Sequence, residues 1–211
     1  SWRNGEAKLN AYLEDYANVI DGLLDTATTD AQRAAAWTAK ATAALMAADH
    51  VTGMAAAVQA QALTLSLPSP WPRFQAERLH AVGLALAGRA DEALALIEPW
   101  REPVQADGDP EHRGRFWADY AYVLNTARRL RDTAHALQQA IEHAQVQGDI
   151  AELATLTSNL ATVRGNLWQV PQALALAQRS LALQTQLGTT DGPEGAVVET
   201  YAGLYSAMTG S

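Results

Sequence analysis

Residues Ala76–Trp100 read AERLHAVGLALAGRADEALALIEPW, and this stretch predicts two helices joined by a tight turn. Apolar residues of the first helix recur at spacings of three and four, as expected for one face of an α-helix. Gly88 stands where a residue in the left-handed conformation can end that helix. Asp91 and Glu92 then fall in the first turn of the second helix, where the helix dipole favours negative charge. At Ala93 a small side chain lets the two helices approach closely.

The remainder of the chain also predicts helices, and no stretch alternates in the manner of a β-strand. We therefore expect an all-α fold in one domain of 211 residues. Its predicted parts are a leading helix in residues 1–29, helix pairs over residues 30–67, 72–105, 111–148 and 150–188, and one further helix in residues 193–211.

Four alanines recur at nearly constant intervals, each early in the second helix of a predicted pair. They are Ala55, Ala93, Ala134 and Ala173. A period of about 40 residues with two helices per unit is typical of a helical solenoid, in which each hairpin buries its faces against its neighbours. A fifth position would fall beyond Ser211, so we expect the array to stop after the first helix of a further pair.

These units resemble the tetratricopeptide repeat, which combines a small residue in the first helix with a turn glycine and an alanine in the second. The resemblance is clearest in LHAVGLALAGRADEAL and is recognisable in SNLATVRGNLWQVPQALALAQRSLAL and in TYAGLYSAMTGS. Arg129 and His50 replace the turn glycine in two other units. The usual period is about 34 residues, and the longer units here are similar to the variant found in large bacterial regulators. Among these are MalT/LuxR-type and SARP-type transcriptional activators and some signalling proteins with nucleotide cyclases.

The resemblance implies a right-handed superhelical solenoid whose first helices line a concave groove. Amides on such a surface can hydrogen-bond a peptide backbone, and aromatic side chains can bury apolar groups of a partner. We therefore expect the groove to bind a peptide segment or an effector, the alternative being a merely hydrated face. The predicted partner-binding residues are Trp37, Lys40, Arg78, Phe116, Asp119, Tyr120, Asn159, Thr162, Asn166 and Tyr201.

Composition and charge argue against several other functions. The net charge of −8 disfavours a large nucleic-acid interface. The absence of cysteine excludes disulfides and thiolate metal sites, and no apolar run approaches the ~18 residues of a membrane span. No phosphate-binding loop or nucleophile motif is present, so we expect no enzyme, no cofactor and no metal site. A helical metal-dependent hydrolase would need His135 or His143 to cluster with carboxylates in one cleft.

The resemblance, together with the absence of catalytic motifs, implies a non-catalytic interaction or sensor module of a larger bacterial regulatory protein in the cytoplasm, a transcriptional activator. The alternative is the scaffold or adaptor region of a signalling enzyme. The expected partner is a protein, a peptide or another domain of the same full-length chain, without direct nucleic-acid or membrane binding by this segment. Apolar residues cover more than one face of the helix in residues 193–211, which predicts a homodimer contact there.

Overall fold

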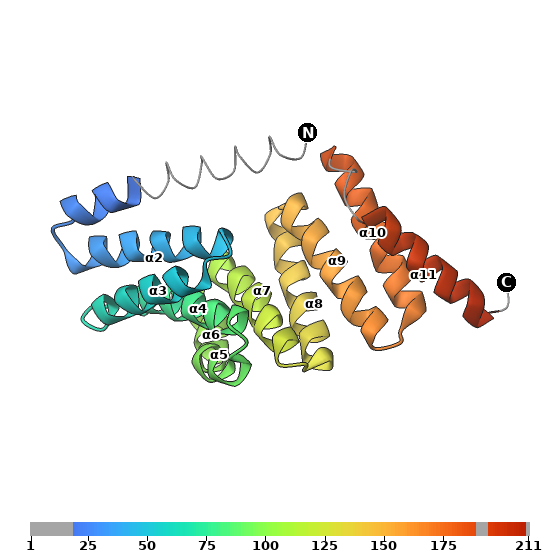
Figure 1. Ribbon diagram of the computed structural model, residues 1–211, viewed down its shortest axis with the longest axis horizontal. Coiled ribbons are helices and arrows are strands. Elements are labelled where there is room, and N and C mark those ends of the chain that lie inside the picture. Colours follow the sequence, from blue (N-terminus) through green and yellow to red (C-terminus); the bar gives the residue numbers. More distant parts are fainter. Residues whose placement is uncertain (1–18, 189–193, 210–211) are drawn as a thin grey trace. The chain divides into compact units, whose positions relative to one another are not determined.

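A computed structural model describes residues 19–188 and 194–209, and in this part of the chain helices alternate with short turns (Figure 1). The all-α prediction is confirmed for these residues. The predictions for residues 1–18 and for the ends of the segment 193–211 lie outside them. After a helical segment at 19–26, the elements are α2 (Asp30–Met46), α3 (His50–Thr64), α4 (Trp71–Leu86), α5 (Ala90–Ile97), a 3₁₀ helix (Glu98–Trp100), α6 (Arg101–Asp107), α7 (Pro110–Thr126), α8 (Leu130–Gln147), α9 (Ile150–Asn166), α10 (Val170–Leu187) and α11 (Glu194–Thr209).

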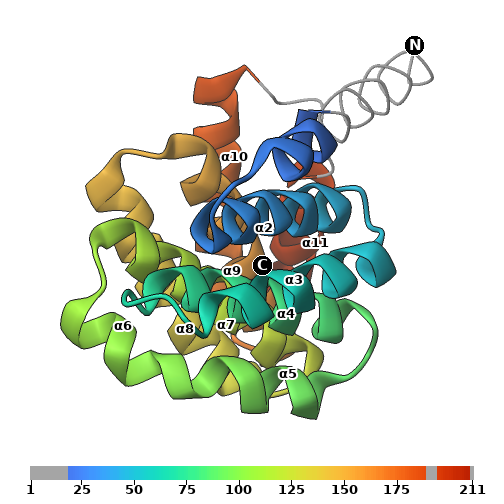
Figure 2. The same ribbon diagram turned by 90° about the vertical axis from the view of Figure 1, so that its left-hand side faces the viewer.

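The chain divides into two compact units, residues 1–100 and 101–211, whereas the sequence predicts a single domain. In the first unit, α2, α3 and α4 lie side by side (Figure 2). In the second, α7, α8, α9, α10 and α11 follow one another, each packed on the next (Figure 1).

The division falls inside the helix pair predicted over residues 72–105. The second helix of that pair is not continuous, because α5 ends at Ile97 and α6 begins only after a 3₁₀ turn. Pro99 lies in this turn, where it lacks the N–H that a continuing helix would need and its ring crowds the preceding turn. The helix that starts in the first unit therefore ends before the boundary predicted at residue 105.

One turn geometry joins the two helices of each pair. Its left-handed residue is Ala48, Gly88, Arg128 or Trp168, with φ between +60° and +77° and a constant interval along the chain. The residue after it donates its N–H to a carbonyl five positions earlier, as in Arg89 to Leu84 at 2.8 Å and Gln169 to Arg164 at 2.9 Å. This is the pattern of a Schellman motif, which satisfies the last carbonyls of a helix. Hydrogen bonding holds the turn even where glycine is absent.

The repeat register predicts that Ala93, Ala134 and Ala173 are buried between the two helices of their pairs, and their burial is confirmed. Ala93 and Ala173 are 0% exposed and Ala134 is 3% exposed. The alignment of Ala55 with these alanines is wrong, because Ala55 is exposed and the equivalent buried residue is Gly53. In each second helix, one residue donates its N–H to the carbonyl of the residue just before the helix. These donors are Gly53, Ala93, Thr133 and Ala173, and they recur at the same interval as the left-handed turn residues. Thr133, rather than Ala134, is therefore the residue equivalent to Ala93 and Ala173, and the predicted alignment of this repeat is displaced by one residue.

The left-handed turn residue allows a reciprocal substitution test within the first unit. Replacing Gly88 by alanine should destabilise the protein by about 1 kcal/mol, because a Cβ is strained at positive φ. Replacing Ala48 by glycine should stabilise it by about 0.5 kcal/mol, since relief of that strain exceeds the added backbone entropy of the unfolded chain. Urea unfolding measures both changes. Two changes of the same sign would contradict the shared turn geometry.

Candidate functional site

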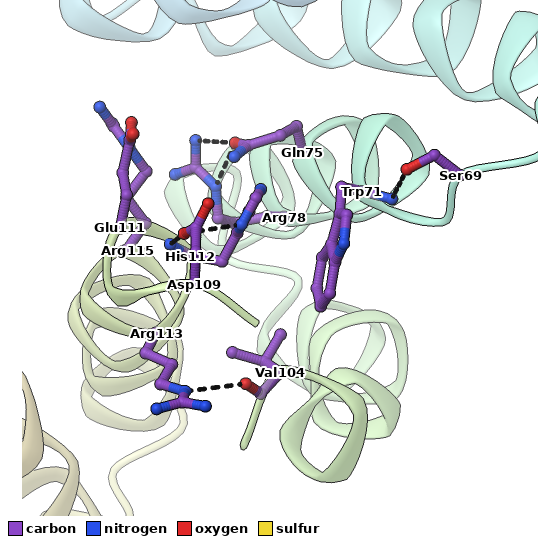
Figure 3. A network of polar contacts seen from close by, with 10 residues as sticks. All are labelled: Ser69, Trp71, Gln75, Arg78, Val104, Asp109, Glu111, His112, Arg113 and Arg115. Carbon is purple, nitrogen blue, oxygen red and sulfur yellow. Dashed lines mark hydrogen bonds and ion pairs between the residues drawn. The ribbon is translucent and has the colours of Figure 1, made fainter. Parts of the chain in front are cut away.

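Three of the predicted partner-binding residues are buried and are corrected here. Phe116 is 0% exposed and Tyr120 is 4% exposed. The Phe116 ring packs on Trp117 and stacks on Tyr120, with ring centroids 5.2 Å apart in both pairs. Arg78 is 7% exposed, and its guanidinium donates to the Gln75 amide oxygen at 2.9 and 3.2 Å (Figure 3). These side chains stabilise the fold and offer no surface to a partner, because successive residues of a helix point in different directions and these point inward.

Trp37 and Lys40 are half-buried and are engaged within the first unit. Trp37 packs against a buried cluster around Ala41 and Leu79. The Lys40 ammonium lies 5.5 Å from the centroid of the Trp37 ring and 2.7 Å from the Asp21 carboxylate. These contacts pack α2 against the preceding helical segment and the core. Trp37 and Lys40 do not lie at the cavity that brings other predicted residues together.

Tyr201 and Asp119 are also half-buried. Tyr201 lies directly over Gly165, where any added Cβ would collide with the tyrosine ring. This contact packs α11 onto α9. Asp119 lies on α7 and lines neither of the two cavities of the second unit described below.

Asn159, Thr162 and Asn166 are exposed, and the structure brings these three predicted residues together at one cavity of the second unit. The cavity has a volume of about 320 Å³ and lies between α7, α8 and α9; we call it the α7/α9 groove. Its floor consists of buried, mainly apolar residues: Ala121, Thr133, Leu137, Leu156 and Val163. Its exposed rim carries Tyr122, Asn125, Asn159, Thr162 and Asn166.

Sequence reasoning missed two residues of this rim, Tyr122 and Asn125. The constant interval between turns makes Tyr122 equivalent to Thr162, which is one of the predicted residues. Counting back from Ala134 instead of Thr133 shifted the α7 positions by one residue and selected inward-facing side chains. Aligning the turn residues Arg128 and Trp168 makes Tyr122 the equivalent of Thr162, because each lies six residues before its turn.

A second cavity of about 320 Å³ in the same unit has a charged lining that includes Glu111, Arg115, Asp149 and Glu152. Its charges already have structural roles. The Arg115 guanidinium lies 3.0 Å from the Glu111 carboxylate, and the Asp149 carboxylate accepts the Glu152 N–H at the start of α9. Burial, reinforced by Asp149 and Asp119, raises the pKa of Glu152 above its ordinary value.

The start of α7 shows the same use of polar groups for capping. The Asp109 carboxylate accepts the His112 N–H at 2.7 Å, and the Arg113 guanidinium donates to the Val104 carbonyl at 3.4 Å (Figure 3). Such contacts fix helix ends and the α6–α7 connection.

In the described part of the chain, neither histidine of the hydrolase alternative belongs to a cluster of acidic side chains that could hold a metal ion. His135 is exposed and packs edge-on against Trp117, with centroids 6.0 Å apart. His143 lies near Arg113, and burial together with that positive charge lowers its pKa. In the segments 19–188 and 194–209, no group of three or more histidine and acidic side chains could hold a metal ion. No helix in the described part of the chain is long and apolar enough to cross a membrane.

Comparisons with known proteins bear on the fold. No protein-family model matches the sequence, and no curated protein matches it. Among solved structures, the chain is similar to aspartyl phosphate phosphatase F from Bacillus subtilis, with a TM-score of 0.68 and 12% identity over 88% of this chain and 52% of that one. It is also similar to BtubC (BKLC) from P. vanneervenii, with a TM-score of 0.63 and 16% identity over 97% of this chain and 92% of that one. The chain spans about half the length of the phosphatase. These likenesses fit a helical-repeat region and show the fold alone.

Proposed function

We propose that this chain is a non-catalytic protein-interaction module that binds an extended segment of a partner protein in the α7/α9 groove. The observation that carries the proposal is the composition of that groove, in which exposed amides and a hydroxyl surround an apolar floor. Amides can pair with the backbone of an extended peptide, while an apolar floor accepts its side chains. The volume of about 320 Å³ is at the lower end of ligand pockets, which suits one or two side chains.

The wider setting that we propose is a right-handed superhelical solenoid within a larger, cytoplasmic bacterial regulator, a transcriptional activator. The evenly spaced turns and the sequence resemblance to tetratricopeptide arrays support the solenoid. The partner segment comes from another protein or from another domain of the full-length chain, and DNA binding resides outside this segment. The alternative is the scaffold or adaptor region of a signalling enzyme. A helix-turn-helix motif flanking this segment in its full reading frame would favour the activator, and a cyclase motif would favour the alternative.

Selection from a random dodecapeptide phage library tests groove binding. Peptides enriched on the chain should bind about tenfold more weakly to the Asn159→Ala variant, because loss of one peptide-to-amide contact is worth roughly that factor. Gln138→Ala is the matched control, since Gln138 is an exposed amide on α8 outside the groove. Fluorescence anisotropy measures the affinities. Equal weakening by both substitutions, or by Gln138→Ala alone, would contradict the proposed groove.

A specific observation favours a second role for α11 in self-association. In the four earlier first helices the residue seven positions before the left-handed turn residue is an alanine with an exposure of at most 1%, namely Ala41, Ala81, Ala121 and Ala161. The same interval places Tyr201 of α11 at this level, and Tyr201 is only half-buried, while a Cβ at Gly203 would meet nothing within 4 Å. Leu204, Tyr205 and Met208 form an exposed apolar face of this helix, with Tyr205 39% exposed.

We propose that this face of α11 pairs with α11 of a second copy. Sedimentation equilibrium should then show a dimer, and Tyr205→Lys should convert it to a monomer because a charge would be buried at the contact. Val146→Lys, at an 84% exposed position of α8, is the control that should leave the dimer intact. A monomeric parent chain at all concentrations would exclude this role.

A further inference from the structure

We infer that the α7/α9 groove binds an internal, uncharged stretch of extended chain with one apolar side chain in the cavity, rather than a chain terminus or a charged segment. This inference rests on the proposed function and names the chemistry of the partner. It follows from the absence of charged residues in the groove lining, from the asparagine side chains on its rim and from the spacing of those asparagines.

The lining of the groove carries no formal charge. None of its residues is an aspartate, glutamate, lysine, arginine or histidine. Among the lining residues the titratable group is the Tyr122 phenol, and burial raises its pKa above its ordinary value, so it stays neutral. A carboxylate or ammonium group entering the cavity would lose hydration without gaining a counter-ion, which is costly.

Two arginines near the ends of these helices, Arg129 and Arg164, have their own partners. The Arg129 guanidinium lies 2.8 Å from the Asp132 carboxylate, and the Arg164 guanidinium donates to the Gln169 amide oxygen at 2.7 Å. Both belong to the turns after α7 and α9. An acidic segment would therefore have to compete with Asp132 and Gln169 for these two guanidinium groups.

The three rim asparagines supply the backbone-binding groups. Within the described chain, the side-chain amides of Asn125, Asn159 and Asn166 make no intramolecular hydrogen bond, whereas the Thr162 hydroxyl donates to the Ser158 carbonyl at 3.3 Å. Each amide carries both donors and an acceptor, so each can pair with the C=O and the N–H of a bound backbone. Neutral amides of this kind can form hydrogen bonds with a peptide backbone and do not require a charged group on the peptide.

The spacing on α9 suits an extended chain. Asn159 and Asn166 are seven residues apart, which places them on one face two turns from each other, about 10 Å along the helix. An extended peptide advances about 3.4 Å per residue, so about three residues link the two amides. Because its side chains alternate in direction, one of these residues directs its side chain toward the floor.

The floor sets the character of that side chain. Ala121, Leu137, Leu156 and Val163 are each at most 6% exposed, so they form an apolar surface at the base of the cavity. Burying one leucine, methionine or phenylalanine side chain there should raise affinity roughly tenfold to hundredfold. A polar side chain would gain no partner from these residues.

The experiment is a phage selection on the full 211-residue chain with randomised peptides held between constant flanks, so that neither terminus is free. We expect enriched peptides with an uncharged core that contains an apolar residue. The corresponding acetylated and amidated synthetic peptide should bind as tightly as the peptide with free ends, and its affinity should change less than about twofold between low and high salt. An enriched core of acidic or basic residues, a need for a free carboxylate, or a large loss of affinity with salt would overturn the inference.

Thr162→Lys provides the matched variant, because Thr162 is exposed on the rim and its replacement leaves the floor intact. Selection on this variant should add acidic residues to the enriched core, which shows that the method detects charge where the groove offers it. Asn159→Ala distinguishes two claims, that the groove binds a peptide and that this peptide is an uncharged internal segment. Charged peptides that lose affinity on Asn159→Ala would overturn the inference and leave groove binding standing. An absence of enrichment, or peptides that Asn159→Ala does not weaken, would overturn both.

Discussion

Replacing Glu77 by alanine is expected to lower the free energy of unfolding by about 3 kcal/mol. Glu77 is 4% exposed and lies on α4. Its carboxylate accepts hydrogen bonds from Gln61 on α3 at 3.0 Å and from the Trp100 indole N–H at 2.7 Å. The Arg73 guanidinium lies 2.7 Å away and completes the shell. The alanine variant leaves the half-buried Gln61 and Trp100 donors without an acceptor, and an unmet donor away from water costs more than a typical hydrogen bond contributes.

The matched control for this prediction is Arg73→Ala. The Arg73 side chain is 49% exposed, so its ion pair with Glu77 is partly screened and should contribute at most about 1 kcal/mol. Chemical denaturation of both variants measures the difference. If the two substitutions cost the same, the carboxylate does not join α3, α4 and the 3₁₀ helix in the way that its contacts indicate.

Replacing Phe116 by alanine is expected to cost about 3–5 kcal/mol, the range for loss of a fully buried aromatic side chain. The ring is 0% exposed and touches both Trp117 and Tyr120, so its removal leaves a cavity that these neighbours cannot close. Asn159→Ala, on the exposed rim, should change stability by less than about 0.5 kcal/mol. Thermal and urea unfolding distinguish the two.

This pair of variants separates a core role from a binding role. Any loss of peptide binding in the Phe116 variant should follow its loss of folded protein, whereas the Asn159 variant should lose binding while remaining folded. A Phe116→Ala protein with unchanged stability and weakened binding would restore the partner-binding role that the sequence predicts for that residue.

The local parts of the fold could be predicted from the sequence. The turn at Gly88, the acidic first turn of the next helix and the buried Ala93 depend on interactions between residues close in the chain, namely backbone hydrogen bonds, the helix dipole and the size of one side chain. Arg128 and Trp168 adopt the same left-handed turn without glycine, and there the regular spacing is the only signal that the sequence contains.

The faces of the helices were decided by tertiary packing. One residue along an α-helix turns a side chain by about 100°, so an alignment anchored at Ala134 instead of Thr133 exchanged the exposed Tyr122 for residues that face inward. The α7/α9 groove has the same origin, since it depends on how neighbouring helices meet rather than on the periodicity of any one helix. The sequence by itself determined helical hairpins at nearly regular intervals and placed Asn159, Thr162 and Asn166 on one helix face. Only the packing of α7 and α8 against that face adds Tyr122 and Asn125 and forms a cavity, because a cavity exists only where side chains from separate helices leave space between them.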